Sequence, residues 1–190
     1  MTTSATAVLR KEHEAILRML DAAEQVARQL ENSTPVSPDT LKGLLEFFQL
    51  FADRCHHGKE EDRLFPLLAE KGLPREGGPI GVMLQEHTMG RSLIRDMAKA
   101  TDAYVAGEKG AGSRWADAAT GYSSLLRSHI HKENNILFVM AERLLSDAEQ
   151  AQLAQAFDQI EIEKMGAGTH ERLHEQMAKI IGEVFAEAHR

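Results

Sequence analysis

The sequence predicts an all-α protein, and three observations lead to this prediction. Strong helix formers such as Ala, Leu, Glu and Arg dominate the 190 residues, whereas Pro occurs only five times. Apolar residues recur three and four positions apart, as on one face of a helix, and no segment alternates like a half-buried strand. We therefore expect an up-down-up-down four-helix bundle with an additional C-terminal helical segment, because long helices joined by short breaks pack as antiparallel neighbours.

The first helix is expected over about 5–30. The second is expected to run from Ser37 to a glycine-rich break at 72–79. Ser37 followed by Pro38 is a typical helix start, because Ser caps and Pro is preorganised for the first turn. Side chains at helical spacing are predicted to face inward, namely His13, Ile16, Leu17, Leu20, Ala23, Ala27 and Leu30 in the first helix, and Leu41, Leu45, Phe48, Ala52, His56, Glu60 and Arg63 or Leu64 in the second.

The third helix is expected over about 80–106. The fourth is expected to run from the turn at 107–112 to about Leu145. The glycines of this turn favour a sharp reversal between antiparallel neighbours. The inward stripes are predicted to be Met83, His87, Gly90, Ile94, Met97, Thr101 and Tyr104, followed by Tyr122, Leu126, His129, Glu133, Ile136, Leu137 and Met140.

A further helical segment is expected over about 146–188. Ser146 with Glu149 three residues later is a capping-box pattern, which marks a helix start. The Gly166-Ala167-Gly168 sequence is a point where this segment can be interrupted. We expect one domain over 1–190, with the bundle at about 5–145 and this segment packed against it.

Composition limits the classes of partner. The formal charge of -7 disfavours nucleic acid and anionic membranes, and no apolar run is long enough for a membrane-spanning helix. The lone Cys55 cannot form an internal disulfide and is expected to be a buried, inert thiol, and residues 1–6 lack the features of a secretory signal. We therefore expect a soluble, cytoplasmic protein. Nine histidines beside few aromatic residues point toward metal ligation.

A His-x-x-x-Glu motif occurs twice at matching positions. His56 to Phe65 in the second helix aligns with His129 to Phe138 in the fourth, and His, Lys, Glu, Leu and Phe recur at the same offsets. Each copy places an imidazole and a carboxylate one turn apart on the same helical face, so that both can hold one ion. Two copies indicate two half-sites.

The other two helices each contribute one inward histidine, His13 and His87, near their starts. In an antiparallel bundle these starts lie at the same end as the two motifs, so six groups can converge. Imidazole with carboxylate suits iron, manganese or zinc, and a glutamate can bridge two ions. Burying these groups without a cation would be costly, and we therefore expect bound metal.

These residues also carry a family resemblance. Lys11-Glu12-His13, Cys55 to Glu61, Glu86-His87 and His129 to Glu133 resemble the hemerythrin HHE cation-binding family over about residues 8–140. The resemblance implies two non-haem iron ions, with His13 and His56 on one, His87 and His129 on the other, and Glu60 and Glu133 as bridges.

The sequence departs from oxygen-carrying hemerythrins at two positions. Those proteins have a second histidine one turn after the third-helix histidine and a later bridging aspartate, where this chain has Arg91 and Glu133. An open coordination position would suit reaction with oxygen, peroxide or nitric oxide, in sensing or stress defence. An iron-handling or regulatory binding protein without turnover uses the same ligands, so the sequence leaves catalysis open.

Three further interpretations stay open at this stage. His170 and His174 share an apolar stripe and are candidates to complete the metal site. Together with Glu171 they also match the H-E-x-x-H pattern of zinc hydrolases, a short motif with a real false-positive rate. His57 and Glu61 are either partners that orient a ligand or surface groups.

Overall fold

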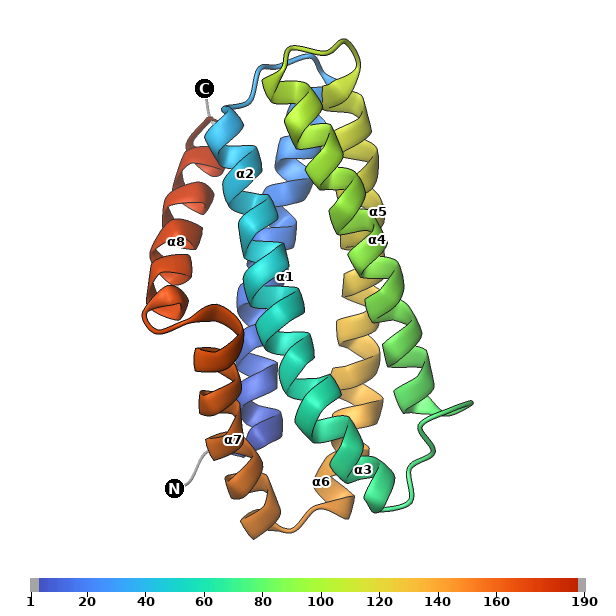
Figure 1. The fold of residues 1–190 in the computed structure, drawn as a ribbon. Coiled ribbons are helices and arrows are strands. Elements are labelled where there is room, and N and C mark those ends of the chain that lie inside the picture. The colour runs from blue at the N-terminus through green and yellow to red at the C-terminus, as the bar shows by residue number, and fades with distance from the viewer. Residues whose placement is uncertain (1–3, 188–190) are drawn as a thin grey trace.

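The computed structural model describes residues 4–187, and all regular structure in this part of the chain is helical (Figure 1). The long helices lie side by side along the length of the molecule. The predicted all-α class is confirmed. None of the helices within the described residues is long and apolar enough to cross a bilayer.

The first two predicted helices differ in regularity. The first is one α-helix, α1 (Ala5–Glu31), whose N-terminus is capped by the Ser4 side chain. The second begins as predicted after Ser37, but is divided into α-helical and wider π-helical pieces. These pieces are α2 (Pro38–Phe47), η1 (Phe48–His57), η2 (Glu60–Leu64) and α3 (Phe65–Glu70).

The third and fourth predicted helices repeat this contrast. The third is α4 (Pro79–Val105), a single α-helix. The fourth begins after Gly110, whose positive φ of 77° forms the turn, and it also contains a π-helical piece. Its pieces are α5 (Ala111–Lys132), η3 (Glu133–Leu137) and α6 (Phe138–Leu144).

The C-terminal segment is divided in two, at the glycines that marked a possible interruption. The first part, α7 (Asp147–Met165), begins with the predicted capping box of Ser146 and Glu149. Gly166 and Gly168 both have positive φ, so the chain turns between them before α8 (Thr169–Glu187). Both helices pack along α1, and α8 also contacts α2. Residue 188, the expected end of this segment, lies outside the described residues.

Two apolar clusters fill the interior, one on each side of a layer of polar residues. The larger cluster includes Ile16 and Ala52, and the smaller one includes Leu9 and Leu64. His56 and Glu60 lie between Ala52 and Leu64 in the chain, and the histidines and glutamates of both His-x-x-x-Glu motifs are almost fully buried. The charged layer is therefore shielded from water by apolar side chains on both sides.

Candidate metal centre

Six predicted site residues come together between the two apolar clusters. They form two groups of potential metal ligands, and within each group the ligand atoms lie within 4.8 Å of one another. All are at most 1% exposed. The predicted members are His13, His56, Glu60, His87, His129 and Glu133, and His57 is an additional member.

The first group joins α1, η1, η2 and η3. It consists of His13, His56, Glu60 and Glu133. The Nε2 atom of His13 is 3.1 Å from Oε2 of Glu133, and Nε2 of His56 is 3.6 Å from Oε1 of Glu60. Both imidazoles thus direct the same nitrogen toward a carboxylate.

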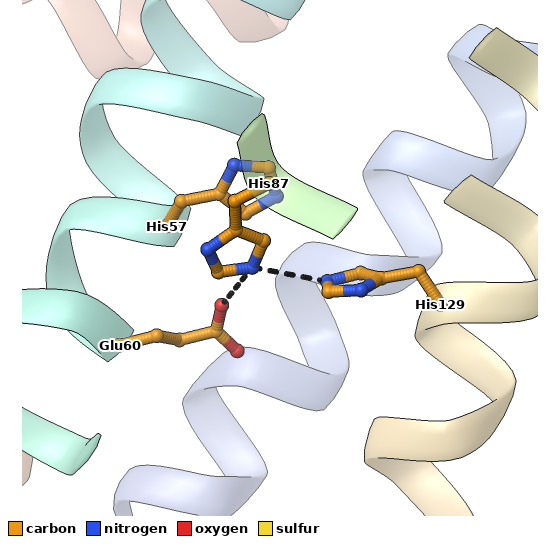
Figure 2. Close-up of side chains that lie close together, drawn as sticks. All are labelled: His57, Glu60, His87 and His129. Atoms are coloured by element: carbon orange, nitrogen blue, oxygen red, sulfur yellow. Dashed lines mark hydrogen bonds and ion pairs between the residues drawn. The ribbon is translucent and has the colours of Figure 1, made fainter. Parts of the chain in front are cut away.

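The second group contains three imidazoles (Figure 2). Nε2 of His87 lies 3.1 Å from Nε2 of His129 and 3.4 Å from Oε2 of Glu60. His57 stacks on His87 with ring centroids 3.8 Å apart. Nε2 of His129 lies 3.3 Å from Oε1 of Glu133. Each of the two glutamates therefore directs one carboxylate oxygen to each group.

Most of the facing atoms have no hydrogen-bond partner among the described residues. Both carboxylate oxygens of Glu60 and of Glu133 are buried without one, and so is Nε2 of His13, His56 and His57. A buried polar atom without a partner costs about 1–3 kcal/mol. Cations placed among these atoms would satisfy all of them at once. The donor set, imidazole nitrogen with carboxylate oxygen, fits iron, manganese or zinc.

The other nitrogen, Nδ1, of each imidazole is held by a side-chain oxygen. Metal-ligating histidines nearly always have such a partner, because it fixes the ring and leaves the Nε2 lone pair free. The five partners are Asn134 for His13 at 3.0 Å, Glu12 for His56 at 2.8 Å, Asp53 for His57 at 3.3 Å, Glu61 for His87 at 2.6 Å and Glu86 for His129 at 2.9 Å.

Cationic side chains neutralise these partner carboxylates. Lys59 forms an ion pair with Glu12, and Lys132 forms one with Glu86. Arg91 bridges two of the partners, with nitrogens 2.7 Å from both Asp53 and Glu61. Arg91 therefore supports the site from outside. His57, which comes from η1, supplies a further imidazole beside His87.

Neighbouring groups give the two central glutamates different proton affinities. Burial, together with the neighbouring charge of Glu133, raises the pKa of Glu60 well above its ordinary value. Burial acts in the same direction on Glu133, but the neighbouring imidazoles of His129 and His13 hold its pKa below the ordinary value through their charges. Burial also lowers the pKa of His56 to about 4 and that of His57 to about 3. These two imidazoles are therefore neutral near pH 7, the form that binds metal.

Both His-x-x-x-Glu motifs adjoin or enter π-helical pieces, which are typical of functional sites. The wider turn changes which residues share a face. Ile136, predicted to face inward, is 50% exposed, whereas Leu137 is buried. The prediction for Ile136 was wrong because it assumed a regular α-helix through η3.

His170 and His174 lie apart from both groups. They are on α8, where Nδ1 of His170 hydrogen-bonds Glu161 of α7 and the two Nε2 atoms are 2.8 Å apart. The structure thus does not bring either residue to the buried groups. Glu171, the acid of the H-E-x-x-H pattern, is exposed.

Cys55 is buried and unpaired, as expected for a structural thiol. Burial raises its pKa to about 12, so the reactive thiolate is suppressed.

Comparisons with known proteins agree with this geometry. The sequence matches the family described as Hemerythrin HHE cation binding domain over residues 4–141. It is 29% identical over 149 residues to proteins named iron-sulfur cluster repair protein YtfE from Yersinia pestis (strain Pestoides F) and Yersinia pseudotuberculosis serotype O:1b (strain IP 31758). The aligned region covers 75% of this chain and 66% of each relative, so the chain spans just under two thirds of their length. No solved structure matches this one.

Proposed function

This chain belongs to the hemerythrin HHE cation-binding family, and we propose that it holds two non-haem iron ions in the buried layer. One ion is assigned to His13 and His56 and the other to His57, His87 and His129, with Glu60 and Glu133 shared between them. The observation that carries the proposal is the set of buried oxygen and nitrogen atoms that face one another without hydrogen-bond partners.

Residues of this chain prepare the site before any ligand arrives. The Nδ1 contacts of the five imidazoles fix their rings, so little reorganisation is needed on binding. The apolar clusters on both sides exclude water, which strengthens the electrostatic attraction between the carboxylates and a cation. When bound, iron supplies redox chemistry toward small oxidants.

The two groups are unequal in imidazoles. The first has two and the second has three. Each glutamate directs one carboxylate oxygen to each group, so with both glutamates shared an ion in the first group would have one imidazole donor fewer and therefore more room for an external ligand. We propose oxygen, peroxide or nitric oxide as that ligand, in sensing or stress defence.

The relatives support an iron-related role but do not define it. They are named for iron-sulfur cluster repair, and the chain covers 66% of their length. Their name also fits the second candidate, an iron-handling protein. Reaction of the reduced protein with oxygen or peroxide distinguishes the two candidates, because only the first predicts that the bound iron meets such a ligand.

We also infer the arrangement that brings the ligands together. The helical runs 5–31, 38–70, 79–105 and 111–144 are proposed to form an up-down-up-down bundle, to which α7 and α8 are added in a single domain. The contacts of α1 and α4 with α5, and of α2 with α4, support this order. We propose the cytoplasm as its location, since the single thiol is buried and unpaired.

The experiment is a measurement of metal content in protein purified without oxygen, with optical spectra before and after air is added. We expect about two irons per chain and new near-ultraviolet bands on oxidation. Glu133→Ala should lose iron, whereas His131→Ala should keep it, because His131 is exposed. One zinc per chain that survives Glu133→Ala would exclude the proposed centre.

A further inference from the structure

His170 and His174 lie one turn apart on α8, the red helix of Figure 1, and line a pocket of about 750 Å³. The pocket lies between α1, α7 and α8. None of the imidazoles of the buried centre lines it. The two Nε2 atoms face each other at 2.8 Å, so both histidines direct the same nitrogen to one point.

The ring of His170 is held in the same manner as the rings of the buried centre. Its Nδ1 hydrogen-bonds Glu161, which leaves Nε2 as the nitrogen directed toward His174. Both rings also meet Phe51 nearly edge-on, with centroids 5.6 Å away. Phe51 is buried and therefore limits how far the two rings can turn.

The charges of the pocket favour a cation. Four carboxylates line it, from Glu12, Glu14, Asp158 and Glu161, against three cationic side chains, from Lys11, Arg18 and Lys59. With neutral histidines the lining thus carries one net negative charge. His174 is exposed, so an ion can reach the pair from solvent.

We propose that His170 and His174 form a second metal site, separate from the buried centre, that takes one transition-metal ion of the Zn²⁺, Ni²⁺ or Cu²⁺ type. Two imidazoles on one tetrahedral ion, each about 2.0–2.1 Å from it, have nitrogens roughly 3.3 Å apart. A small rotation of the exposed His174 ring gives that separation. Water in the pocket completes the coordination.

The donors select this class of ion. Imidazole suits zinc, copper and nickel, whereas magnesium and calcium prefer oxygen ligands. The site is for binding and not for hydrolysis, because Glu171 is exposed and no third imidazole joins the pair among the described residues. It differs from the buried centre in being open to water.

The test is zinc binding to the full chain, measured by equilibrium dialysis with elemental analysis of both zinc and iron. We expect wild type to bind one more zinc per chain than His170→Ala/His174→Ala, with the same iron content. His174→Ala alone should weaken this zinc at least tenfold. Equal zinc number and affinity in wild type and the double variant would overturn the proposal.

Two matched variants separate ligation from other effects. Glu161→Gln should weaken the extra zinc about 10–100-fold, since loss of a partner at the other imidazole nitrogen has that effect on metal affinity. His131→Ala removes another exposed histidine and should leave the zinc unchanged. A drop in zinc binding with His131→Ala equal to that of His174→Ala would mean unspecific binding to surface histidines.

This site and the buried centre are tested independently. His129→Ala should reduce iron while the extra zinc stays, and His174→Ala should do the reverse. Loss of the extra zinc in His129→Ala would show that the zinc had occupied the buried groups, and would overturn the second site.

Discussion

Each imidazole of the buried centre uses its two nitrogens differently. Nδ1 contacts an oxygen at the outside of the centre, and Nε2 faces inward. The outer partner is often the sequence neighbour of another helix's ligand, as Glu12 beside His13 holds His56, and Glu86 beside His87 holds His129. Each helix therefore orients the ligand of another, which couples the geometry of the site to helix packing.

His57 provides the first prediction at this scale. If it ligates the second ion, His57→Ala should lower the affinity for that ion at least tenfold and leave the first nearly unchanged. The measurement is metal titration of the metal-free protein, with His131→Ala as the matched exposed control. Two ions of unchanged affinity in His57→Ala would mean that this ring only packs against His87.

The metal-free protein should lose stability as pH falls from about 6.5. Burial lowers the pKa of His56 to about 4 and of His57 to about 3, and it also lowers that of His87. Below pH 6.5 the unfolded chain binds protons there that the folded chain does not, so the free energy of unfolding falls. The raised pKa of Glu60 offsets part of this, because the folded chain holds a proton there that the unfolded chain binds only near pH 4.5.

Between about pH 4.5 and 6.5, three lowered imidazoles against one raised carboxyl leave a net slope of about two protons, or about 2.7 kcal/mol per pH unit. Urea unfolding of the metal-free protein at several pH values measures this slope. His57→Gln should reduce it and His131→Gln should not. A stability that rises as the pH falls would contradict the assignment.

Six of the seven residues in the two ligand groups could be predicted from the sequence, because these histidines and glutamates recur at helical spacing. His57 was left open for a physical reason. Neighbouring residues in an α-helix point about 100° apart, so His56 and His57 cannot share a face there. In the structure the centre receives both rings, because His56 belongs to one group and His57 to the other. The outer partners depend on packing between helices, which spacing alone does not reveal.

At the scale of elements, regular helices were predicted well and irregular pieces were not. The bounds of α1 and α4 lie within one residue of the expected ranges. The π-helical pieces were missed because no periodicity marks a local widening of the turn. The glycines at 166 and 168 correctly indicated the break before α8. However, α8 packs on α1 and α2, and this position places His170 and His174 away from the buried centre.

Two glycines, one in α8 and one in α2 where it meets α8, predict different effects of alanine on stability. A Cβ at Gly182 would meet nothing within 4 Å, so Gly182→Ala should stabilise the protein by about 0.5–1 kcal/mol through helix propensity. A Cβ at Gly43 would lie 2.7 Å from Cδ1 of Ile180, where α2 meets α8. Gly43→Ala should therefore stabilise less, or destabilise.

Urea unfolding gives both free energies, and hydrogen exchange of α8 amides locates the effect. Faster exchange in α8 is expected for Gly43→Ala only. An equal gain in stability from the two substitutions would indicate that Ile180 moves aside at no cost, so that α8 is loosely packed.

On the scale of the whole molecule, the polar layer interrupts what would otherwise be one apolar core. Most of its ligand atoms have no hydrogen-bond partner in the described structure, so without metal they reduce stability. Metal bound to the folded state stabilises it in proportion to the logarithm of its concentration over Kd. The free energy of unfolding of this protein should therefore depend strongly on bound metal, and burial of the two apolar clusters alone should not account for it.

Replacing both central glutamates by an apolar residue of similar length separates these contributions. Glu60→Met/Glu133→Met removes four buried oxygens that lack partners and joins the two apolar clusters, so the metal-free variant should unfold at higher urea than metal-free wild type, by about 1–4 kcal/mol. Adding iron should raise the urea midpoint of wild type and leave that of the variant unchanged, because its shared ligands are gone. A metal-free variant that is less stable than metal-free wild type would contradict this prediction. It would mean that the polar layer stabilises the fold without a cation, so that the binding site does not lower the stability of the protein.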